Sequence, residues 1–282
     1  MNKETVKVPE LKLPESKLLL VDLDKTLIDA ANYEITDKTI VDEIKRVQQI
    51  GWKIGLSSDS PLESLLDWRN QLAMNGPVIA EKGAVVWIDS KHEVIEKESQ
   101  KFFSDLNLKF TNYLTDQRKS FLFGDVTKFI WNKPKLVEML DDEIVLVQSH
   151  RKCSFNLYGR SINQNGELII NNQLTKEMII IVHSLTFNNL PFEVDEDFNQ
   201  DYGIYILAPK NTTKRLGTQK LINILNINKI GMIGDSGTDI LGKDIAYQYA
   251  VGNAKPELKN VSEYVATGTF TKGVIEILRL IK

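Results

Sequence analysis

The sequence predicts an α/β protein, with a doubly wound parallel sheet as its core and a separate α+β unit inserted into that core. Two observations lead to this fold class. The start of the chain alternates short apolar runs with stretches of helical periodicity, which is typical of β-α-β units with right-handed crossovers. Residues 84–209 lose this alternation, and it resumes from Lys214. We therefore expect a core of residues 1–83 and 210–282, interrupted by an inserted unit of residues 84–209.

The first strand, helix and second strand follow from apolar patterning. Residues 18–21 are apolar without alternation, as in a strand that is buried on both faces of a parallel sheet. Apolar residues then recur at helical spacing between Thr36, a candidate N-cap, and Gly51, a candidate stop. Residues 53–56 are expected to form the second strand.

The next helix carries a start signature. Ser60 stands at the expected cap, Pro61 at the first helical position, and Glu63 where it would close a capping box. This helix should end near Met74, and residues 78–80 should form the third strand.

The remaining elements are less regular. In the inserted unit we expect strands at 84–88, 143–147, 154–157 and 202–207, and helices at 97–108 and 174–184. In the second part of the core we expect a helix at 217–225, a strand at 229–233, a helix at 240–247, a strand at 249–251 and two further helical segments.

Composition excludes several classes of function. The formal net charge of -3 gives no basic field that would attract nucleic acid or anionic lipid. No apolar run approaches the roughly 20 residues that span a bilayer, and the polar start of the chain lacks the apolar segment of a signal peptide. The single cysteine, Cys153, cannot form an intramolecular disulfide, and three histidines are few for a zinc site. We expect a cytoplasmic protein in a reducing compartment.

Two aspartates follow the first strand directly. Side chains two apart on a strand point the same way, so Asp22 and Asp24 should face the crevice at the carboxyl end of the sheet while Leu23 enters the core. Neighbouring carboxylates titrate differently, so one can stay ionised while the other donates a proton. The competing interpretation is a pair of acids on a solvated loop.

A second acidic pair follows a later strand. Asp235 and Asp239 are four residues apart, and Gly234 and Gly237 let the backbone turn tightly near a ligand. Carboxylates, a backbone carbonyl and waters are the oxygen ligands that magnesium prefers. A glycine turn with a helix-capping aspartate is the alternative.

Two further residues could neutralise phosphate charge. Ser58 ends the second strand, where its hydroxyl and the following amides could receive a phosphate. Lys214 precedes a predicted helix, and its ammonium could stabilise the same anion. Most Ser and Lys residues at such positions are only solvated loop residues.

In this order, these stretches resemble the haloacid dehalogenase (HAD) superfamily of aspartyl phosphohydrolases, in the branch with a large inserted cap. Within that branch, the sequence resembles Cof-type sugar phosphatases and archaeal phosphoglycolate phosphatases. The matching segments are DLDKTL at 22–27, GWKIGLSSDSP at 51–61, GPVIAEKGA at 76–84, Lys214, GDSGTD at 234–239, AVGNA at 250–254 and TKGV at 271–274. The resemblance implies a HAD-like Rossmannoid core with an inserted α+β cap domain that sets substrate specificity. The sequence departs from the family where Asp59 and Ser60 replace a common Gly-Arg pair and where Thr238 replaces Asn.

The resemblance also implies a reaction and the residues that carry it. A HAD-type phosphatase would use Asp22 as the nucleophile that forms an aspartyl phosphate, and Asp24 as the general acid and base. Ser58 and Lys214 would bind the phosphoryl group, and Thr26 would steady the first-motif loop.

Magnesium is the cofactor that the resemblance implies. Asp22, the backbone carbonyl of Asp24, and Asp235 would hold it, with Asp239 as a ligand or as a support for the ligands. The substrate would be a small phosphorylated metabolite, either a sugar phosphate or a phosphoglycolate-like compound, with no nucleic acid or membrane as partner. The sequence does not indicate an oligomeric state.

Several alternatives stay open at this point. A phosphosugar mutase would use the same aspartyl phosphate, and a catalytically idle protein could keep the fold for binding alone. The basic residues His150, Arg151, Lys152 and Arg160 could meet an acidic or polyhydroxyl leaving group, or they could form a solvated charge cluster. Cys153 is best explained as a packing residue.

Overall fold

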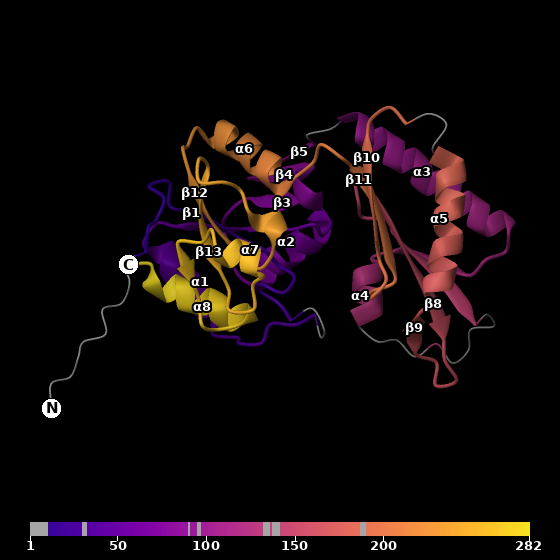
Figure 1. The fold of residues 1–282 in the computed structure, drawn as a ribbon, viewed down its shortest axis with the longest axis horizontal. Helices are drawn as coiled ribbons and strands as arrows, with labels where there is room; N and C mark the ends of the chain where they lie inside the picture. The colour runs from indigo at the N-terminus through magenta and orange to yellow at the C-terminus, as the bar shows by residue number, and fades with distance from the viewer. Residues whose placement is uncertain are drawn as a thin grey trace.

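The computed structural model describes residues 11–29, 33–89, 91–94, 97–131, 136, 142–186 and 190–282. Two sheets, each with its own helices, stand next to each other (Figure 1). The polar stretch at residues 1–10 lies outside the described residues. No described helix has both the length and the apolar character needed to cross a membrane.

The first sheet is the predicted parallel core. Its strands are β1 (Leu18–Val21), β2 (Lys53–Ser57), β3 (Val78–Ala80), β4 (Val85–Ile88), β5 (Lys91–Val94), β12 (Ile230–Gly234), β13 (Ala246–Ala250) and β14 (Tyr264–Val265), in the order β14-β13-β12-β1-β2-β3-β4-β5. All pairs from β14 to β3 are parallel. The central strand β1 pairs on both sides, with Leu20 opposite Gly55 of β2 and Met232 of β12. The prediction of a doubly wound parallel sheet is confirmed.

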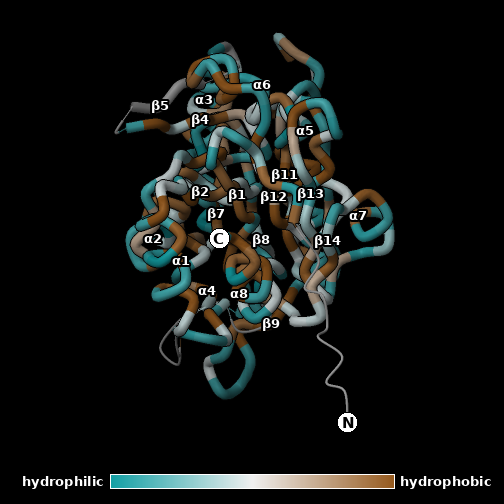
Figure 2. Tube along the Cα trace, turned by 90° about the vertical axis from the view of Figure 1, so that its left-hand side faces the viewer, coloured by the Kyte–Doolittle hydropathy of each residue, from teal (hydrophilic) through white to brown (hydrophobic). Residues whose placement is uncertain are grey.

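Helices cover both faces of this sheet. They are α1 (Ile40–Gln49), α2 (Leu62–Gln71), α6 (Lys214–Leu225), α7 (Pro256–Lys259) and α8 (Phe270–Leu280), with the short 3-10 turns η1 (Glu81–Gly83) and η2 (Gly237–Asp239). Alternate residues of β1 serve the two faces: Leu19 packs in the cluster that contains α1, α2 and α8, and Leu20 packs against α6. The central strand β1 is accordingly apolar and buried along its whole length, and hydrophobic segments gather among the central strands (Figure 2).

The second sheet forms the inserted unit, which we define as residues 97–209. Its strands are β6 (Phe121–Gly124), β7 (Glu143–Gln148), β8 (Phe155–Ile162), β9 (Leu168–Ile170), β10 (Val194–Asn199) and β11 (Ile204–Pro209), and its helices are α3 (Lys97–Asp116), α4 (Val126–Trp131) and α5 (Asn172–Thr186). The helices α3 and α5 pack with Phe155 and Leu157 on one face. The short α4 packs with Ile144 and Leu146 on the other face, which is turned towards the first sheet (Figure 1).

One predicted strand belongs to the other sheet. The stretch 84–88, expected in the inserted unit, contains β4, which pairs antiparallel with β3 and extends the first sheet. β5 then pairs with β4. The chain thus leaves the first sheet after β5 and not at Ala84. The expected domain boundaries themselves stay a prediction.

The helix predicted at 240–247 is wrong. Gly242 has a φ of +90°, which an α-helix does not accommodate, and β13 begins at Ala246. The side chain of Gln248 binds this loop: its Oε1 accepts from the backbone N–H of Leu241 and its Nε2 donates to the carbonyl of Asp239. The predicted cap of α1 is also displaced, because Thr39 and not Thr36 precedes the helix.

Candidate active site

The two acidic motifs meet at one edge of the first sheet. Asp22 directly follows β1 and Asp235 directly follows β12, and these two strands are parallel neighbours. The backbone N–H of Asp22 continues the ladder by donating to the carbonyl of Ile233, 2.9 Å away. Leu23 is buried in the core cluster, as the alternation predicts. The fold therefore brings together residues from opposite ends of the chain.

Three carboxylates form a compact buried group. Oxygens of Asp22, Asp235 and Asp239 all lie within 4.8 Å of one another, and the residues are 4%, 7% and 0% exposed. Asp239 is fixed by its own turn: its Oδ2 accepts from the N–H groups of Asp235 and Ser236, both at 3.1 Å. A side chain at position 234 would collide with Asp239, so this turn requires Gly234. An oxygen-only group of this kind suits a hard divalent cation.

Lys214 brings a positive charge into direct contact with this group. It opens α6, whose N-cap Thr213 accepts a hydrogen bond from the N–H of Leu216. Its Nζ donates to Oδ1 of Asp22 and to Oδ1 of Asp239, both at 2.7 Å, and the residue is only 3% exposed. The structure thus places the predicted lysine beside the predicted nucleophile.

The electrostatics of the group show an excess of negative charge. Burial raises the pKa of Asp22 well above its ordinary value, against the opposing charge of Lys214. Burial, with the charge of Asp239, raises the pKa of Asp235 to about 6. Burial alone would lower the pKa of Lys214, but the charges of Asp22 and Asp239 outweigh it and raise that pKa well above its ordinary value. Three carboxylates share one ammonium, so a divalent cation would balance the charge.

Asp24 lies beside this group in a different environment. It is partly exposed, and its Oδ2 accepts a long hydrogen bond of 3.5 Å from the hydroxyl of Ser60. Burial raises the pKa of Asp24 in spite of the charge of Lys214, and the charge of Asp59 adds to the rise. A carboxyl group with a raised pKa is suited to proton transfer. Thr26 is buried and donates to Oδ2 of Asp22 at 3.0 Å.

Ser58 lies at the same edge of the sheet, one residue beyond β2. It is buried, its N–H donates to the carbonyl of Ile79, and its Oγ accepts from the N–H of Ser60 at 3.2 Å. The capping box predicted after it is wrong. Pro61 is the N-cap of α2 and no side chain caps the helix, because the Ser60 hydroxyl turns towards Asp24 instead.

The inserted unit presents a polar face to these residues. Gln148, Asn156 and Tyr158 alternate with the side chains that pack under α3 and α5, and so lie on the opposite face of the second sheet. The Oε1 of Gln148 and the Oδ1 of Asn156 are buried and have no hydrogen-bond partner among the described residues. Burial raises the pKa of Tyr158, and the charge of Asp24 contributes to that rise, which places the two residues near each other.

The four basic residues of this region separate into different roles. Arg160 donates to the carbonyls of Gly159, Tyr202 and Gly203 and therefore braces the inserted unit itself. Lys152 pairs with Glu63 of α2 at 3.3 Å.

Arg151 and His150 each keep a buried ring or guanidinium nitrogen that makes no hydrogen bond within the described residues. The Nη1 of Arg151 donates to the hydroxyl of Ser154 at 2.9 Å, while its Nε is buried without a partner in the part of the chain that the structure describes. The Nδ1 of His150 is also buried without a hydrogen-bond partner among the described residues.

Tyr33 belongs to the site but carries no sequence signal. Its ring stacks on Trp131 of α4, with centroids 5.2 Å apart, and meets Trp68 of α2 edge-on at 5.7 Å. Its hydroxyl is buried, and burial, with the charge of Asp24, raises its pKa. An isolated tyrosine in a loop could not be identified from sequence, because its neighbours come from two other helices.

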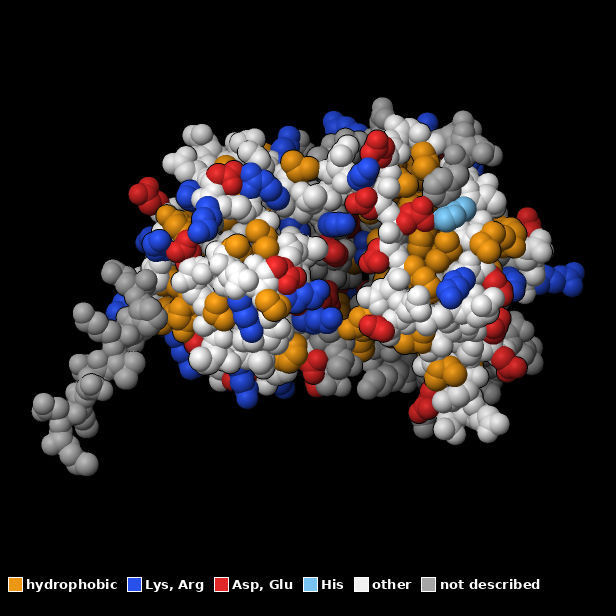
Figure 3. Space-filling model, in the orientation of Figure 1, with side chains coloured by type: hydrophobic (Ala, Val, Ile, Leu, Met, Phe, Trp, Pro, Cys, Tyr) orange, Lys and Arg blue, Asp and Glu red, His pale blue; other side chains and the backbone are white. Residues whose placement is uncertain are grey.

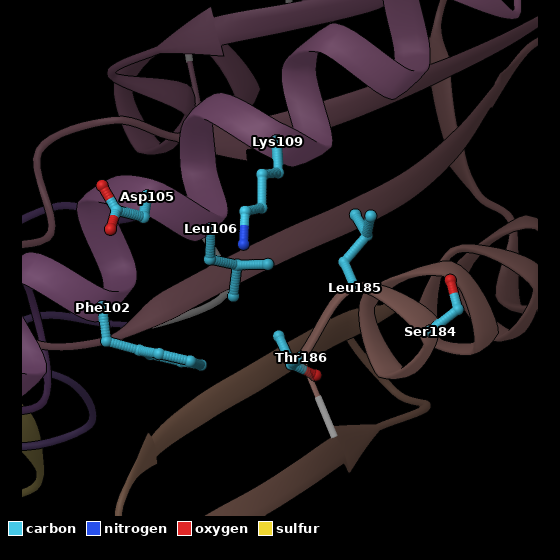
Figure 4. Close-up of a pocket in the computed structure, with 7 residues that line it drawn as sticks. All are labelled: Phe102, Asp105, Leu106, Lys109, Ser184, Leu185 and Thr186. Atoms are coloured by element: carbon cyan, nitrogen blue, oxygen red, sulfur yellow. The ribbon is translucent and has the colours of Figure 1, made fainter. Parts of the chain in front are cut away.

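The surface is hollowed between the two units, and acidic and basic side chains line that region (Figure 3). A second hollow lies between α3 and α5, and it is lined by Phe102, Asp105, Leu106, Lys109, Ser184, Leu185 and Thr186 (Figure 4). Only two of these residues are charged, and they form no cluster that could hold a metal. The carboxylate group at the edge of the first sheet is therefore the candidate site.

Comparison with known proteins gives a consistent result. A family model described as haloacid dehalogenase-like hydrolase matches residues 19–278. Phosphoglycolate phosphatase 1 of Saccharolobus solfataricus is 28% identical over 265 residues, which cover 93% of this chain and 94% of the relative. Phosphoglycolate phosphatase of Sulfolobus acidocaldarius is 24% identical over 268 residues, with 93% and 95% covered.

Solved structures share the fold. A haloacid dehalogenase-like hydrolase from Bacteroides thetaiotaomicron superimposes with a TM-score of 0.63 at 16% identity, covering 95% of this chain and 100% of that chain. A sugar phosphatase of HAD subclass IIB superimposes with a TM-score of 0.55 at 16% identity, covering 93% and 97%.

Proposed function

Because the chain belongs to the haloacid dehalogenase-like hydrolases, as the match over residues 19–278 shows, we propose that it is a magnesium-dependent phosphomonoesterase. It hydrolyses a small phosphorylated metabolite through an aspartyl phosphate. Relatives that match over almost their whole length are named phosphoglycolate phosphatases, and a structural neighbour is a sugar phosphatase. Both substrate classes are therefore retained for this chain.

The residues present fit a magnesium ion. The carboxylates of Asp22 and Asp235 have the spacing and the oxygen chemistry for it, and a bound cation would oppose the burial and the charge of Asp239 that raise the pKa of Asp235 to about 6. Asp239 suits the role of support better than that of ligand, because its two oxygens already accept from Lys214, from Ser236 and from the backbone of the turn. When bound, the ion neutralises phosphate charge and orients the phosphoryl group.

The first step uses Asp22 as the nucleophile. An oxygen of Asp22 forms a bond to phosphorus while the bond from phosphorus to the leaving-group oxygen breaks. Lys214 neutralises part of the charge that repels the carboxylate from the phosphate. Asp24 gives its proton to the departing alkoxide, and its raised pKa favours the protonated form that this requires.

The second step restores the enzyme. Asp24, now a carboxylate, takes a proton from a water molecule, whose oxygen attacks phosphorus as the bond to Asp22 breaks and inorganic phosphate is released. Ser58 holds the phosphoryl group with its hydroxyl, and Thr26 holds Asp22 in the attacking position.

The inserted unit contacts the leaving group in this proposal. Gln148 and Asn156 offer buried, unpaired amide oxygens to its hydroxyl groups, and Arg151 offers a donor to an acidic group.

A cytoplasmic location of the protein also stays a prediction.

One observation carries the proposal: Asp22 and Asp235, more than two hundred positions apart, share a buried group with Lys214. The test is release of p-nitrophenol from p-nitrophenyl phosphate with and without Mg²⁺. We expect activity only with the ion, its loss in excess EDTA, and its return when Mg²⁺ is added back.

The nucleophile is tested with a matched pair of variants. Asp22→Asn should lower kcat by about 10³-fold or more, because the amide cannot form the aspartyl phosphate. Asp42→Asn, an exposed aspartate on α1, should have wild-type activity. Equal activity of the two variants would exclude Asp22 as the nucleophile, and turnover that persists in excess EDTA would exclude the dependence on Mg²⁺.

A further inference from the structure

The turn η1, residues 81–83, touches every element that carries a phosphate-binding group. The N–H of Glu81 donates to the carbonyl of Ser60 at 3.1 Å, and the N–H of Lys82 donates to the carbonyl of Ser58 at 3.3 Å. A side chain at Gly83 would collide with the carbonyl of Thr213, directly before Lys214. This turn thus packs against the Ser58 loop on one side and against the start of α6 on the other.

The backbone of the turn is strained. Glu81 has a φ of 49° and Lys82 a φ of 58°, so two successive non-glycine residues adopt the left-handed conformation. Such conformations persist only where the surroundings hold them, and they cluster at functional sites. The hydrogen bonds to Ser58 and Ser60 are part of what holds this one.

The side chain of Glu81 reaches into the inserted unit. Its carboxylate accepts from the N–H of Lys152 at 2.7 Å, from the N–H of Cys153 at 2.9 Å and from the hydroxyl of Ser154 at 2.6 Å. Glu81 is 1% exposed, and none of the ion pairs among the described residues involves it. Three donors from one short loop therefore compensate a buried charge.

The loop 152–154 is anchored in the first unit in a second way. Cys153 is fully buried and packs in the hydrophobic cluster of the first sheet, although it belongs to the inserted unit. This confirms its interpretation as a packing residue. Among the described residues, other ion pairs between the units, such as Lys152 with Glu63 and Lys128 with Asp67, join side chains that are partly exposed. Exposed pairs of this kind contribute little.

The same loop positions the groups that face the substrate. Ser154, which donates to Glu81, also accepts from Nη1 of Arg151. β8 begins with the next residue and carries Asn156 towards the site. A continuous series of hydrogen bonds thus joins Arg151, Ser154, Glu81, Ser60 and Asp24.

We propose that Glu81 is a positioning residue that fixes loop 152–154, and with it Arg151 and β8, at a set place over Asp24. The inference that Glu81 positions groups which bind the leaving group rests on the proposed function. The inference that Glu81 fixes the place of the inserted unit is independent of that function. Without the carboxylate, the loop loses three hydrogen bonds, and the contacts that remain between the units among the described residues include partly exposed ion pairs, the stacking of Tyr33 on Trp131 and the packing of Cys153.

The experiment compares Glu81→Gln and Glu81→Ala with Glu63→Gln. The control removes the exposed ion pair to Lys152, in the same loop. The first readout is the KM of phosphoglycolate, whose leaving group carries a carboxylate, relative to the inhibition constant of inorganic phosphate, both measured with Mg²⁺. The second readout is acrylamide quenching of Trp131 fluorescence, obtained by subtracting the signal of a Trp131→Phe background. Trp131 stacks on Tyr33 across the two units, so displacement of the inserted unit exposes it.

For both Glu81 variants we expect KM to rise about tenfold, while kcat and the phosphate inhibition constant change less than about threefold. Contacts that hold the leaving group equally in the ground state and the transition state act on KM alone. Quenching of Trp131 should at least double, and Glu63→Gln should stay within twofold of wild type in every readout. Equal rises in KM and in the phosphate inhibition constant would indicate general damage to the site and overturn the proposal, as would unchanged quenching.

Two further results keep the test decisive. If Glu81→Ala does not fold, Ser154→Ala removes one donor from the other side of the contact and should shift KM and quenching in the same direction, by a smaller factor. Unchanged values for Ser154→Ala and Glu81→Gln would overturn the proposal. A wild-type protein without phosphatase activity would refute the proposed function, whereas the quenching measurement would still decide the placement by Glu81.

Discussion

At the scale of single residues, Asp239 is the most constrained group of the site. Its Oδ2 accepts from two backbone N–H groups and from the hydroxyl of Ser236, and its Oδ1 accepts from Lys214. Every one of these partners is a donor, and the two carboxylate oxygens supply the acceptors that they require. Asp239 therefore sets the direction of the Lys214 ammonium and the shape of the turn that carries Asp235.

Asp239→Asn tests this assignment. The amide group must turn its NH₂ towards one set of donors, which leaves a buried donor without a partner. We expect the free energy of unfolding to fall by about 2–4 kcal/mol, and activity to fall with it. Urea unfolding followed by circular dichroism measures the change, with Asp42→Asn as the exposed control. A variant as stable as wild type would show that the turn does not depend on the charge.

At the scale of elements, α8 is locked to the loop that precedes it by one carboxylate. Glu276 accepts from the hydroxyl of Tyr264 at 2.6 Å, from the N–H and the hydroxyl of Thr267, and from the N–H of Gly268. Burial would raise the pKa of Glu276, but these hydrogen bonds outweigh it and lower the pKa below its ordinary value.

The direction of this shift fixes the pH at which α8 loosens. Because the pKa of Glu276 is lower in the folded state, its contribution is complete above the ordinary glutamate value and is lost as pH falls through the folded value. We expect wild-type stability to decline below about pH 4.5 more steeply than that of Glu276→Gln. Urea unfolding between pH 3 and pH 6 measures both slopes, with Glu257→Gln, an exposed glutamate on α7, as control. Parallel curves for Glu276→Gln and wild type would exclude the role.

The elements also show how far sequence patterning reaches. Strands buried on both faces, such as β1 and β12, were predictable because continuous apolar runs leave few alternatives. The apolar spacing of residues 240–247 favours a helix. It does not reveal that Gly242 has a left-handed backbone or that the side chain of Gln248, on β13, binds this loop. The partnership of β4 depends on pairing with β3, which local pattern does not specify.

The candidate site divides in the same way. Asp22, Asp24, Ser58, Lys214 and Asp235 follow strand ends or precede a helix, so topology alone brings them to one edge of the sheet. Glu81 and Tyr33 could not be predicted, because the donors to Glu81 and the Trp131 ring that stacks on Tyr33 belong to the inserted unit, and the sequence carries no signal of how the two units meet.

At the scale of the whole molecule, the two units have separate hydrophobic cores. Leu157 lies in the cluster under α3 and α5, and Ile54 in the cluster of the first sheet, and the two clusters share no residue. Units with separate cores can unfold independently unless their interface is large and apolar.

We expect calorimetry to show two overlapping transitions, with a van't Hoff enthalpy for the whole curve that is smaller than the total calorimetric enthalpy, because a single cooperative unit would make the two enthalpies equal. Leu157→Ala should lower one transition, at a cost of about 2–5 kcal/mol, and Ile54→Ala should lower the other. A single transition that both variants shift equally would show that the protein unfolds as one body.

The central position of β1 has a consequence for how the protein folds during its synthesis. Leu19 pairs with Gly231, so the central strand lacks one neighbour until a segment about two hundred residues later has left the ribosome. At 5–20 residues per second, that interval lasts roughly 10–40 s. During this interval, β1 of the nascent polypeptide has an unpaired apolar edge, which can form hydrogen bonds with non-native strands or with other chains. The candidate site can assemble only after β12 has been translated, and chaperone demand should be greatest just before that moment.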